Sequence, residues 1–249
     1  STGFRAPTLH QRHLTNSQYI IVASSPEPLL QGTLANNNPA IEALGVPNLF
    51  AETSKNIAAG LTYKFTNNFY ASLDFYQINV DDRVLFSSQI GYKTGAPGNP
   101  QNPVEDILDQ YGVTAVQFFI NAGNTKTSGA DFVLNYRNID MGGNAKLHAN
   151  LATNFNKTTI DAITTPQALA DEGYDIFERI EKGLITNARP KSKVILGLDY
   201  EAEKFDIGLY NTMFGEVTIT SPNGPEFDQV LTSKTATDLS VRYKFSNSL

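Results

Sequence analysis

One segment of the chain, residues 144–155, alternates between apolar and polar side chains over a dozen positions. Leu147 and Ala149 occupy odd positions, whereas Lys146 and His148 occupy even ones. Because successive side chains of a β-strand point to opposite faces, this segment would have one apolar face and one hydrated face. Strands of soluble sheets are usually about half as long. A tilted strand needs about 9–11 residues to cross a bilayer, so the segment predicts a membrane-crossing strand.

The same alternation recurs along the chain and predicts about seven long strands. The other segments with one apolar face are residues 55–65, 69–80, 130–137, 194–200, 205–209 and 239–245. No run of eighteen apolar residues occurs, which excludes a helical membrane span. The hydrophobic content of 41% is compatible with a barrel, because barrels distribute their lipid-facing residues by alternation.

Polar residues of these segments alternate with the apolar ones and are therefore expected to face the lumen of a barrel. This set comprises Asp131, Arg137, Lys146, His148, Asn150, Asp238 and Arg242.

The connections between the segments are of two kinds. Short turns are expected at about 66–68, 138–143, 201–204 and 246–248, and long loops at about 5–51, 86–116, 158–189 and 219–231. Aromatic residues such as Phe65, Phe69, Tyr136 and Phe205 gather beside the short turns, as they do at a membrane interface. The pattern predicts an all-β, antiparallel, up-and-down transmembrane β-barrel segment, with short periplasmic turns and long extracellular loops.

Small helices are expected within the long loops. Asn102 would cap a helix that begins at Pro103, with Glu105 as its capping-box partner and Gly112 as its stop. Residues 38–45 repeat this arrangement in shorter form, and residues 165–183 repeat it at greater length.

The sequence offers no catalytic constellation, and we expect no enzymatic activity and no cofactor. It has no cysteine, which excludes disulfides and thiolate metal sites. It contains no glycine-rich phosphate loop, Gly-x-Ser-x-Gly elbow or His-Glu-x-x-His motif. The 25 acidic residues outnumber the 19 basic ones, which argues against a nucleic-acid partner.

The first long loop concentrates polar and aromatic groups, and we take four of them as candidate ligand-binding residues: His10, Arg12, His13 and Tyr19. His10 and His13 are three positions apart and could share one side of a helical turn as metal ligands. No third ligand lies at a useful spacing, so the sequence favours a polar loop and no metal site.

Five phrases carry a family resemblance. They are residues 3–9 (Gly-Phe-Arg-Ala-Pro-Thr-Leu), 52–63, 73–84, 118–131 and 237–243 (Thr-Asp-Leu-Ser-Val-Arg-Tyr). In their order and spacing, across essentially the whole chain, they resemble the barrels of TonB-dependent outer-membrane receptors.

The resemblance implies that residues 1–249 belong to the C-terminal part of a 22-stranded barrel in the outer membrane of a Gram-negative bacterium. It further implies import of a scarce nutrient such as siderophore-bound iron, cobalamin or a glycan. The expected partners are this small-molecule or metal-chelate ligand, outer-membrane lipid, and the TonB complex, reached through a plug and N-terminal segment not found in these residues. The alternatives are a passive porin-type channel, a structural or adhesive surface barrel, and a soluble β-sandwich.

Overall fold

The structure, a computed structural model, describes residues 1–20 and 29–245. Its strands are β1 (Thr2–Arg5), β2 (Asn16–Ile20), β3 (Leu29–Thr33), β4 (Glu52–Lys64), β5 (Phe69–Phe86), β6 (Ile90–Gly91), β7 (Ala115–Gln117), β8 (Phe119–Gly142), β9 (Ala145–Ile163), β10 (Ser192–Glu201), β11 (Phe205–Phe214), β12 (Val217–Ile219), β13 (Gln229–Leu231) and β14 (Lys234–Tyr243). Its helices are α1 (Leu9–His13), α2 (Pro39–Ala43), α3 (Pro103–Gln110), α4 (Gln167–Asp171), α5 (Arg179–Thr186) and the 3-10 turn η1 (Pro225–Phe227). None of the helices in these ranges is both long and apolar enough to span a membrane.

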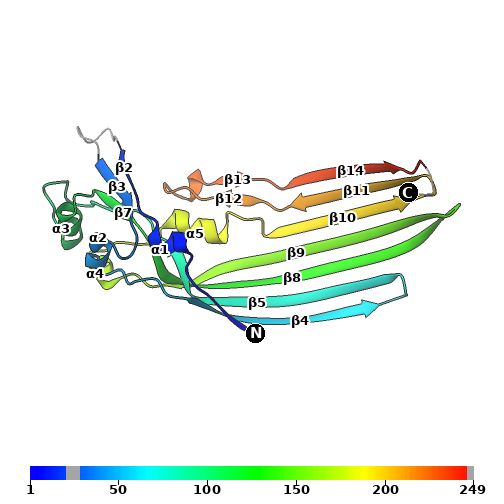
Figure 1. Cartoon of the computed structure of the whole chain (residues 1–249), viewed down its shortest axis with the longest axis horizontal. Helices are drawn as coiled ribbons and strands as arrows, with labels where there is room; N and C mark the ends of the chain where they lie inside the picture. The colour runs from blue at the N-terminus through cyan, green and yellow to red at the C-terminus, as the bar shows by residue number, and fades with distance from the viewer. Residues whose placement is uncertain (21–28, 246–249) are drawn as a thin grey trace. The chain divides into compact units, whose positions relative to one another are not determined.

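Eight strands form one sheet in the order β1-β4-β5-β8-β9-β10-β11-β14 (Figure 1). Seven of them are long, and each of these long strands pairs with the next long strand along the chain. The sheet has β1 and β14 at its two edges. The prediction of seven long strands in an up-and-down antiparallel barrel segment is confirmed.

The chain divides into two compact units. The first, which we call the loop unit, comprises residues 1–55, 79–126 and 159–182. The second, which we call the sheet unit, comprises residues 56–78, 127–158 and 183–249. The long strands β4, β5, β8 and β9 contribute residues to both units.

In the sheet unit, the strand register places the apolar residues of neighbouring strands on one face. Leu198 of β10 lies opposite Ala149 of β9 and Leu209 of β11, and Leu209 lies opposite Leu239 of β14. Leu239 is 67% exposed although it is a large apolar side chain. An apolar face of this extent is suited to lipid rather than to water.

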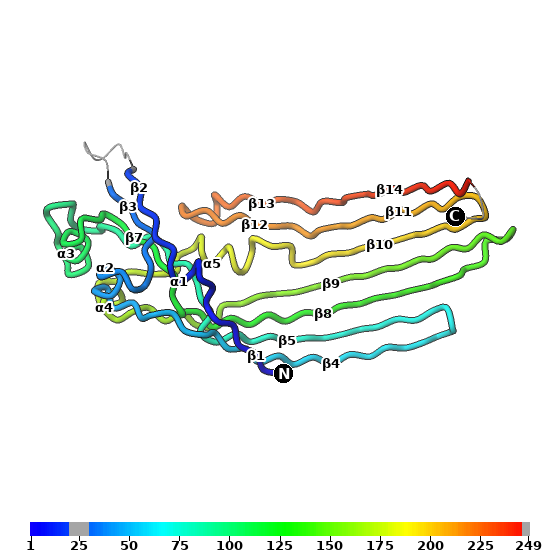
Figure 2. Tube along the Cα trace, in the orientation of Figure 1, coloured from blue at the N-terminus to red at the C-terminus, as the bar shows by residue number. Residues whose placement is uncertain are grey.

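Short connections join β4 to β5, β8 to β9 and β10 to β11, as the trace in Figure 2 shows. The predicted turn at 138–143 is wrong in its bounds, because β8 continues to Gly142 and β9 begins at Ala145. Gly143 and Asn144 both have positive φ, of 58° and 63°. Two successive positive φ values form the tight two-residue turn that matches the twist of a hairpin, so no longer turn is needed. The turn predicted at 246–248 lies outside the described residues.

The loop unit has a hydrophobic core built from all three of its long connections. Strands β2, β3, β7 and β6 form a four-stranded sheet in that order, in which β3 and β7 are parallel. The largest fully buried apolar side chains come from separate stretches of the chain: Ile41, Leu44, Ile90, Leu108, Phe118, Leu169 and Ile176. The connections therefore pack together as a folded body with small helices, which confirms the prediction of helices in the loops.

Two details of the loop helices differ from the sequence prediction. Residues 165–183 hold two helices, α4 and α5, instead of one, because Gly173 takes a φ of +70° between them. Strand β9 also runs to Ile163, beyond the expected start of the 158–189 loop. After Phe155 the odd positions become polar (Lys157, Thr159 and Asp161), so the apolar alternation of the earlier part of the strand is interrupted there.

Glu105 of α3 has a different role from the capping-box partner that was predicted. Asn102 does cap the helix, and its side chain accepts from the Glu105 backbone N–H at 3.0 Å. The buried Glu105 carboxylate instead accepts from the backbone N–H groups of Lys93, Thr94, Gly95 and Gln101, at 2.8–3.1 Å. Burial raises the pKa of Glu105, but the four hydrogen bonds to its charged form outweigh this and lower it to about 2.

Candidate functional site

The polar residues of the sheet unit lie opposite one another across four strands. His148 of β9 is opposite Asp199 of β10, which is opposite Gly208 of β11, and Gly208 is opposite Ser240 of β14. The neighbouring polar row on the turn side is formed by Lys146, Glu201, Asp206 and Arg242, and the row on the other side by Asn150, Gly197, Tyr210 and Asp238. Five of the residues that were predicted to face a lumen therefore share one face of the sheet, opposite the apolar one.

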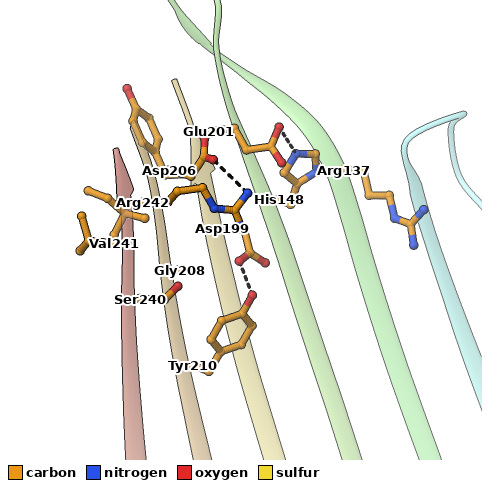
Figure 3. Close-up of a pocket in the computed structure, with 12 residues that line it drawn as sticks. Arg137, His148, Asp199, Glu201, Asp206, Gly208, Tyr210, Ser240, Val241 and Arg242 are labelled. Carbon is orange, nitrogen blue, oxygen red and sulfur yellow. Dashed lines mark hydrogen bonds and ion pairs between the residues drawn. The ribbon is translucent and has the colours of Figure 1, made fainter. Parts of the chain in front are cut away.

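Charged side chains near the short turns surround a hollow of about 660 Å³ on this face (Figure 3). His148 Nε2 lies 3.7 Å from Glu201 Oε2, and Arg242 Nη1 lies 3.6 Å from Asp206 Oδ2. Lys244 Nζ lies 2.7 Å from the other oxygen of Asp206. Arg137 of β8 also lines the hollow. These groups form a polar, charged wall in which cations and carboxylates alternate.

Tyr210 holds the centre of this wall in place. Its hydroxyl donates a hydrogen bond to Asp199 (Figure 3). A Cβ atom added to Gly197 or to Gly208 would lie 3.0 Å from the Tyr210 ring. The ring therefore lies close against both glycines, and an added Cβ would also meet Asn150 at Gly197 and Ser240 at Gly208.

A second polar cluster on the sheet unit contains Asp131, the remaining predicted lumen residue. Asn154 Nδ2 donates to Asp131 Oδ1 at 2.6 Å and lies 3.2 Å from the hydroxyl of Tyr76. Tyr76 in turn packs against Gly129, where an added Cβ would collide with its ring. Two tyrosines on different strands thus make the same arrangement, a ring over glycine and a hydroxyl held by a polar side chain.

The four ligand-binding candidates of the first long loop are only partly brought together. Arg12 and His13 of α1 line a small hollow of about 70 Å³, together with Asn36, Asn37, Asn48 and Leu49. His10 instead meets the ring of Phe119 edge-on, with 6.2 Å between ring centroids. Tyr19 lies on β2 and is 73% exposed. Within residues 1–20 and 29–245, no three His, Cys, Asp or Glu side chains are grouped so that they could hold a metal ion.

Helix α1, which positions Arg12 and His13, was not foreseen, although the sequence carries its signal. Thr8 Oγ1 accepts from the Gln11 N–H at 3.1 Å, and Gln11 Oε1 accepts from the Thr8 N–H at 2.9 Å. This reciprocal pair is a capping box, written in the sequence as Thr-x-x-Gln. The contribution of Asn36 to the same hollow had no signal in the sequence.

Comparison with protein families settles the relationship that the fold suggests. The family model described as TonB dependent receptor-like, beta-barrel matches residues 1–249. The chain belongs to this family. None of the curated proteins compared with the chain matches it.

Solved structures of similar fold are TonB-dependent receptors as well. The ferric enterobactin receptor PfeA of Pseudomonas aeruginosa, in complex with enterobactin, gives a TM-score of 0.61 at 14% identity over 99% of this chain and 30% of its own. The siderophore receptor PirA of Acinetobacter baumannii gives 0.56 at 14% identity over 99% and 32%, and the FrpB iron transporter of Neisseria meningitidis gives 0.51 at 16% over 80% and 25%. At these identities the likeness concerns the fold alone. The TonB-dependent receptor barrel described here spans about a quarter to a third of the length of these proteins.

Proposed function

We propose that this chain forms barrel wall and extracellular loops of an outer-membrane receptor that imports a scarce small-molecule or metal-chelate nutrient, of the siderophore-iron, cobalamin or glycan type. The energy would come from the TonB complex, acting through a plug and an N-terminal segment outside these residues. Membership of the TonB-dependent receptor family is the observation that carries the proposal. Similar solved structures are named as siderophore receptors and an iron transporter, which favours an iron chelate.

The two faces of the sheet unit support a role as barrel wall. We propose that the apolar face, with Leu151, Leu198 and Leu239, contacts lipid, and that the opposite face lines the lumen. His148 beside Glu201, and the ion pair of Arg242 with Asp206, would then face the plug near its periplasmic end. A charged wall of this kind suits a partner that must stay seated in the barrel and still move during transport, because surface ion pairs are individually weak.

The loop unit supports a role in contacting the ligand. Its hydrophobic core holds the three connections in one folded body, so polar side chains such as Arg12 and His13 are presented from a defined surface. Preorganised groups bind a ligand with a smaller loss of conformational entropy than mobile ones.

Transport by the intact receptor tests the proposal. A strain that lacks the gene is compared with the complemented strain for accumulation of a panel of labelled ferric siderophores, cobalamin and oligosaccharides. We expect one ligand to accumulate only in the complemented strain, and only while TonB is functional. Accumulation that persists without TonB would instead identify a passive channel. A complemented strain that binds surfaces or cells but accumulates no ligand would identify an adhesive barrel.

A further inference from the structure

Asn223 precedes a glycine in an exposed loop of the sheet unit. The loop comprises residues 220–228 and connects β12 to β13. Asn223 and Gly224 form the only asparagine–glycine pair of the sequence, and Asn223 is exposed. The side-chain carbon of an asparagine can reach the backbone nitrogen of the next residue, and a glycine there has no side chain to obstruct the approach. The pair is therefore a candidate for a reaction within the chain.

The loop requires a glycine at position 224. Gly224 has a φ of 130° and a ψ of 166°, a conformation that is essentially restricted to glycine. The Glu226 carboxylate also occupies the space of a side chain, because its oxygens would lie 2.6 and 2.7 Å from a Cβ atom added to Gly224. The fold itself thus places a glycine directly after Asn223.

The two groups that would react are not held by other contacts. Asn223 donates its backbone N–H to Ser221 Oγ at 3.2 Å, and the Gly224 carbonyl oxygen accepts from the Phe227 N–H at 3.2 Å. Within residues 1–20 and 29–245, no hydrogen bond involves the side-chain amide of Asn223 or the N–H of Gly224. Rotation of the Asn223 side chain can therefore bring its Cγ atom to the Gly224 nitrogen without breaking a hydrogen bond.

We propose that Asn223 is a site of self-modification, at which the chain converts asparagine to aspartate and isoaspartate. The Gly224 nitrogen gives up its proton and bonds to Asn223 Cγ, which closes a cyclic imide. The bond from Cγ to the amide nitrogen breaks, and this nitrogen takes up a proton through the solvent and leaves as ammonia. The reaction is favoured because both partners belong to neighbouring residues of one chain.

Water from the solvent then opens the imide. It adds to one of the two carbonyl carbons and breaks the bond of that carbon to the Gly224 nitrogen. Opening at Cγ leaves an aspartate, whereas opening at the backbone carbonyl carbon leaves an isoaspartate, whose main chain continues through Cγ. Both products carry a carboxylate in place of the neutral amide.

The modification changes the charge and the backbone of the loop. The new carboxylate joins those of Glu226 and Asp228 in the same short segment, and like charges repel one another. Isoaspartate adds one carbon to the main chain inside the part of the loop that is closed by the hydrogen bond from the Ser221 N–H to Asp228 Oδ1, at 2.8 Å. The loop thus becomes more acidic and longer, and this inference does not depend on the proposed function.

The experiment incubates the full chain in detergent micelles and analyses its peptides by mass spectrometry over time. We expect the peptide that contains Asn223 to gain the mass difference between an OH and an NH₂ group. Fragmentation should show isoaspartate as well as aspartate at this position. Asn144, an exposed turn asparagine followed by Ala145, is the control within the same digest. We expect Asn223 to be converted at least about tenfold faster than Asn144, because no side chain hinders the attacking nitrogen.

Two variants separate the reaction from general degradation. Asn223→Gln has a side chain one carbon longer, which places the amide carbon poorly for ring closure, so conversion at this position should be lost. Asn99→Gln changes an exposed asparagine whose following residue, Pro100, has no N–H. It is the matched control and should leave the conversion of Asn223 unchanged.

A conversion of Asn223 no faster than that of Asn144 would overturn the proposal. Formation of aspartate without isoaspartate would also overturn it, because direct hydrolysis of the side-chain amide by water yields aspartate alone. An unchanged rate of conversion in Asn223→Gln would have the same meaning, since it would show that the ring is not formed.

Discussion

Tyr210 of β11 donates its hydroxyl hydrogen to Asp199 of β10, while its ring lies against Gly208 of its own strand and Gly197 of β10. Gly208 lies directly opposite Asp199, and Gly197 lies directly opposite Tyr210 itself. One side chain therefore links two strands by a hydrogen bond and by contact with their backbone. A shift of the strands by one residue would break both, since it would move Asp199 to the other face.

Loss of this hydrogen bond should weaken the sheet unit. Tyr210→Phe keeps the ring over the glycines but removes the donor to a charged acceptor, which is expected to lower the free energy of unfolding by about 1.5–3 kcal/mol. Urea unfolding followed by fluorescence in detergent micelles measures it. Tyr243→Phe is the control, since Tyr243 lies on the opposite face and is 54% exposed. A change of equal size in both variants would contradict the role assigned to the hydrogen bond.

A larger side chain at Gly208 should lower the stability of the sheet unit through steric overlap rather than through the loss of a hydrogen bond. A Cβ there would lie 3.0 Å from Tyr210 Cε2 and 2.7 Å from Ser240 Oγ, so Gly208→Val forces both side chains to move. Overpacking of this kind costs about 1–3 kcal/mol. The same unfolding experiment applies, with Ala236→Val on the exposed edge strand β14 as the control. A fully stable Gly208→Val variant would show that the ring does not need the glycine.

The two faces of β9 should respond differently to an added charge. Leu151 lies opposite Leu196 on the apolar face, whereas His148 lies beside Glu201 on the polar one. Leu151→Arg is expected to cost about 2–4 kcal/mol if this face meets the bilayer core, and His148→Arg is expected to cost little. Folding into lipid vesicles at increasing urea concentration measures both. Equal losses would refute the assignment of the faces.

Acid should loosen the loop around α3 through Glu105. The pKa of Glu105 in the folded protein, about 2, lies below its ordinary value of 4.5. The folded state therefore binds this proton less readily than the unfolded state, and the stabilisation is fully present above about pH 4.5 and lost as the pH falls towards 2. Limited acid proteolysis of residues 92–101, as a function of pH, should follow this course.

Glu105→Gln isolates that effect. The neutral amide cannot replace the charged acceptor of four backbone N–H groups, so the loop should be cleaved readily at every pH in the window. Asp106→Asn changes an exposed neighbouring carboxylate and should retain the pH course of the wild type. A Glu105→Gln loop as resistant as the wild type at neutral pH would rule out the anchoring role.

The sequence predicted the strands of the sheet unit because their signal is local. The alternation around Leu147 and His148 is visible in a dozen residues, and it assigns each side chain of the strand to one of the two faces. The signal ends after Phe155, where the odd positions of β9 become polar, whereas the strand itself continues to Ile163. The turn was predicted over too many residues, because the composition of a segment does not show which of its residues adopt positive φ.

The packing of the loop unit could not be predicted from the sequence, because it depends on contacts between segments that are far apart in the chain. Ile41, Leu108 and Leu169 belong to three connections that each read as a separate polar loop with a small helix, yet they share one core. Glu105 was assigned to Asn102 as a capping-box partner, because that pattern is local, whereas the backbone of Lys93, Thr94 and Gly95 is brought to its carboxylate only by the fold. Asn36 could not be found at all, since its partners Pro47 and Phe119 are identified only by the fold.

The parallel pairing of β3 with β7 limits the order in which the strands of the loop unit can pair. Leu30 accepts hydrogen bonds from Thr114, which lies 84 positions further along the chain. Contacts over such a separation form slowly, because a long loop must close before they contribute. Strand β3 must therefore stay unpaired on that side until the chain up to β7 is available. During this interval its open edge can pair with other chains.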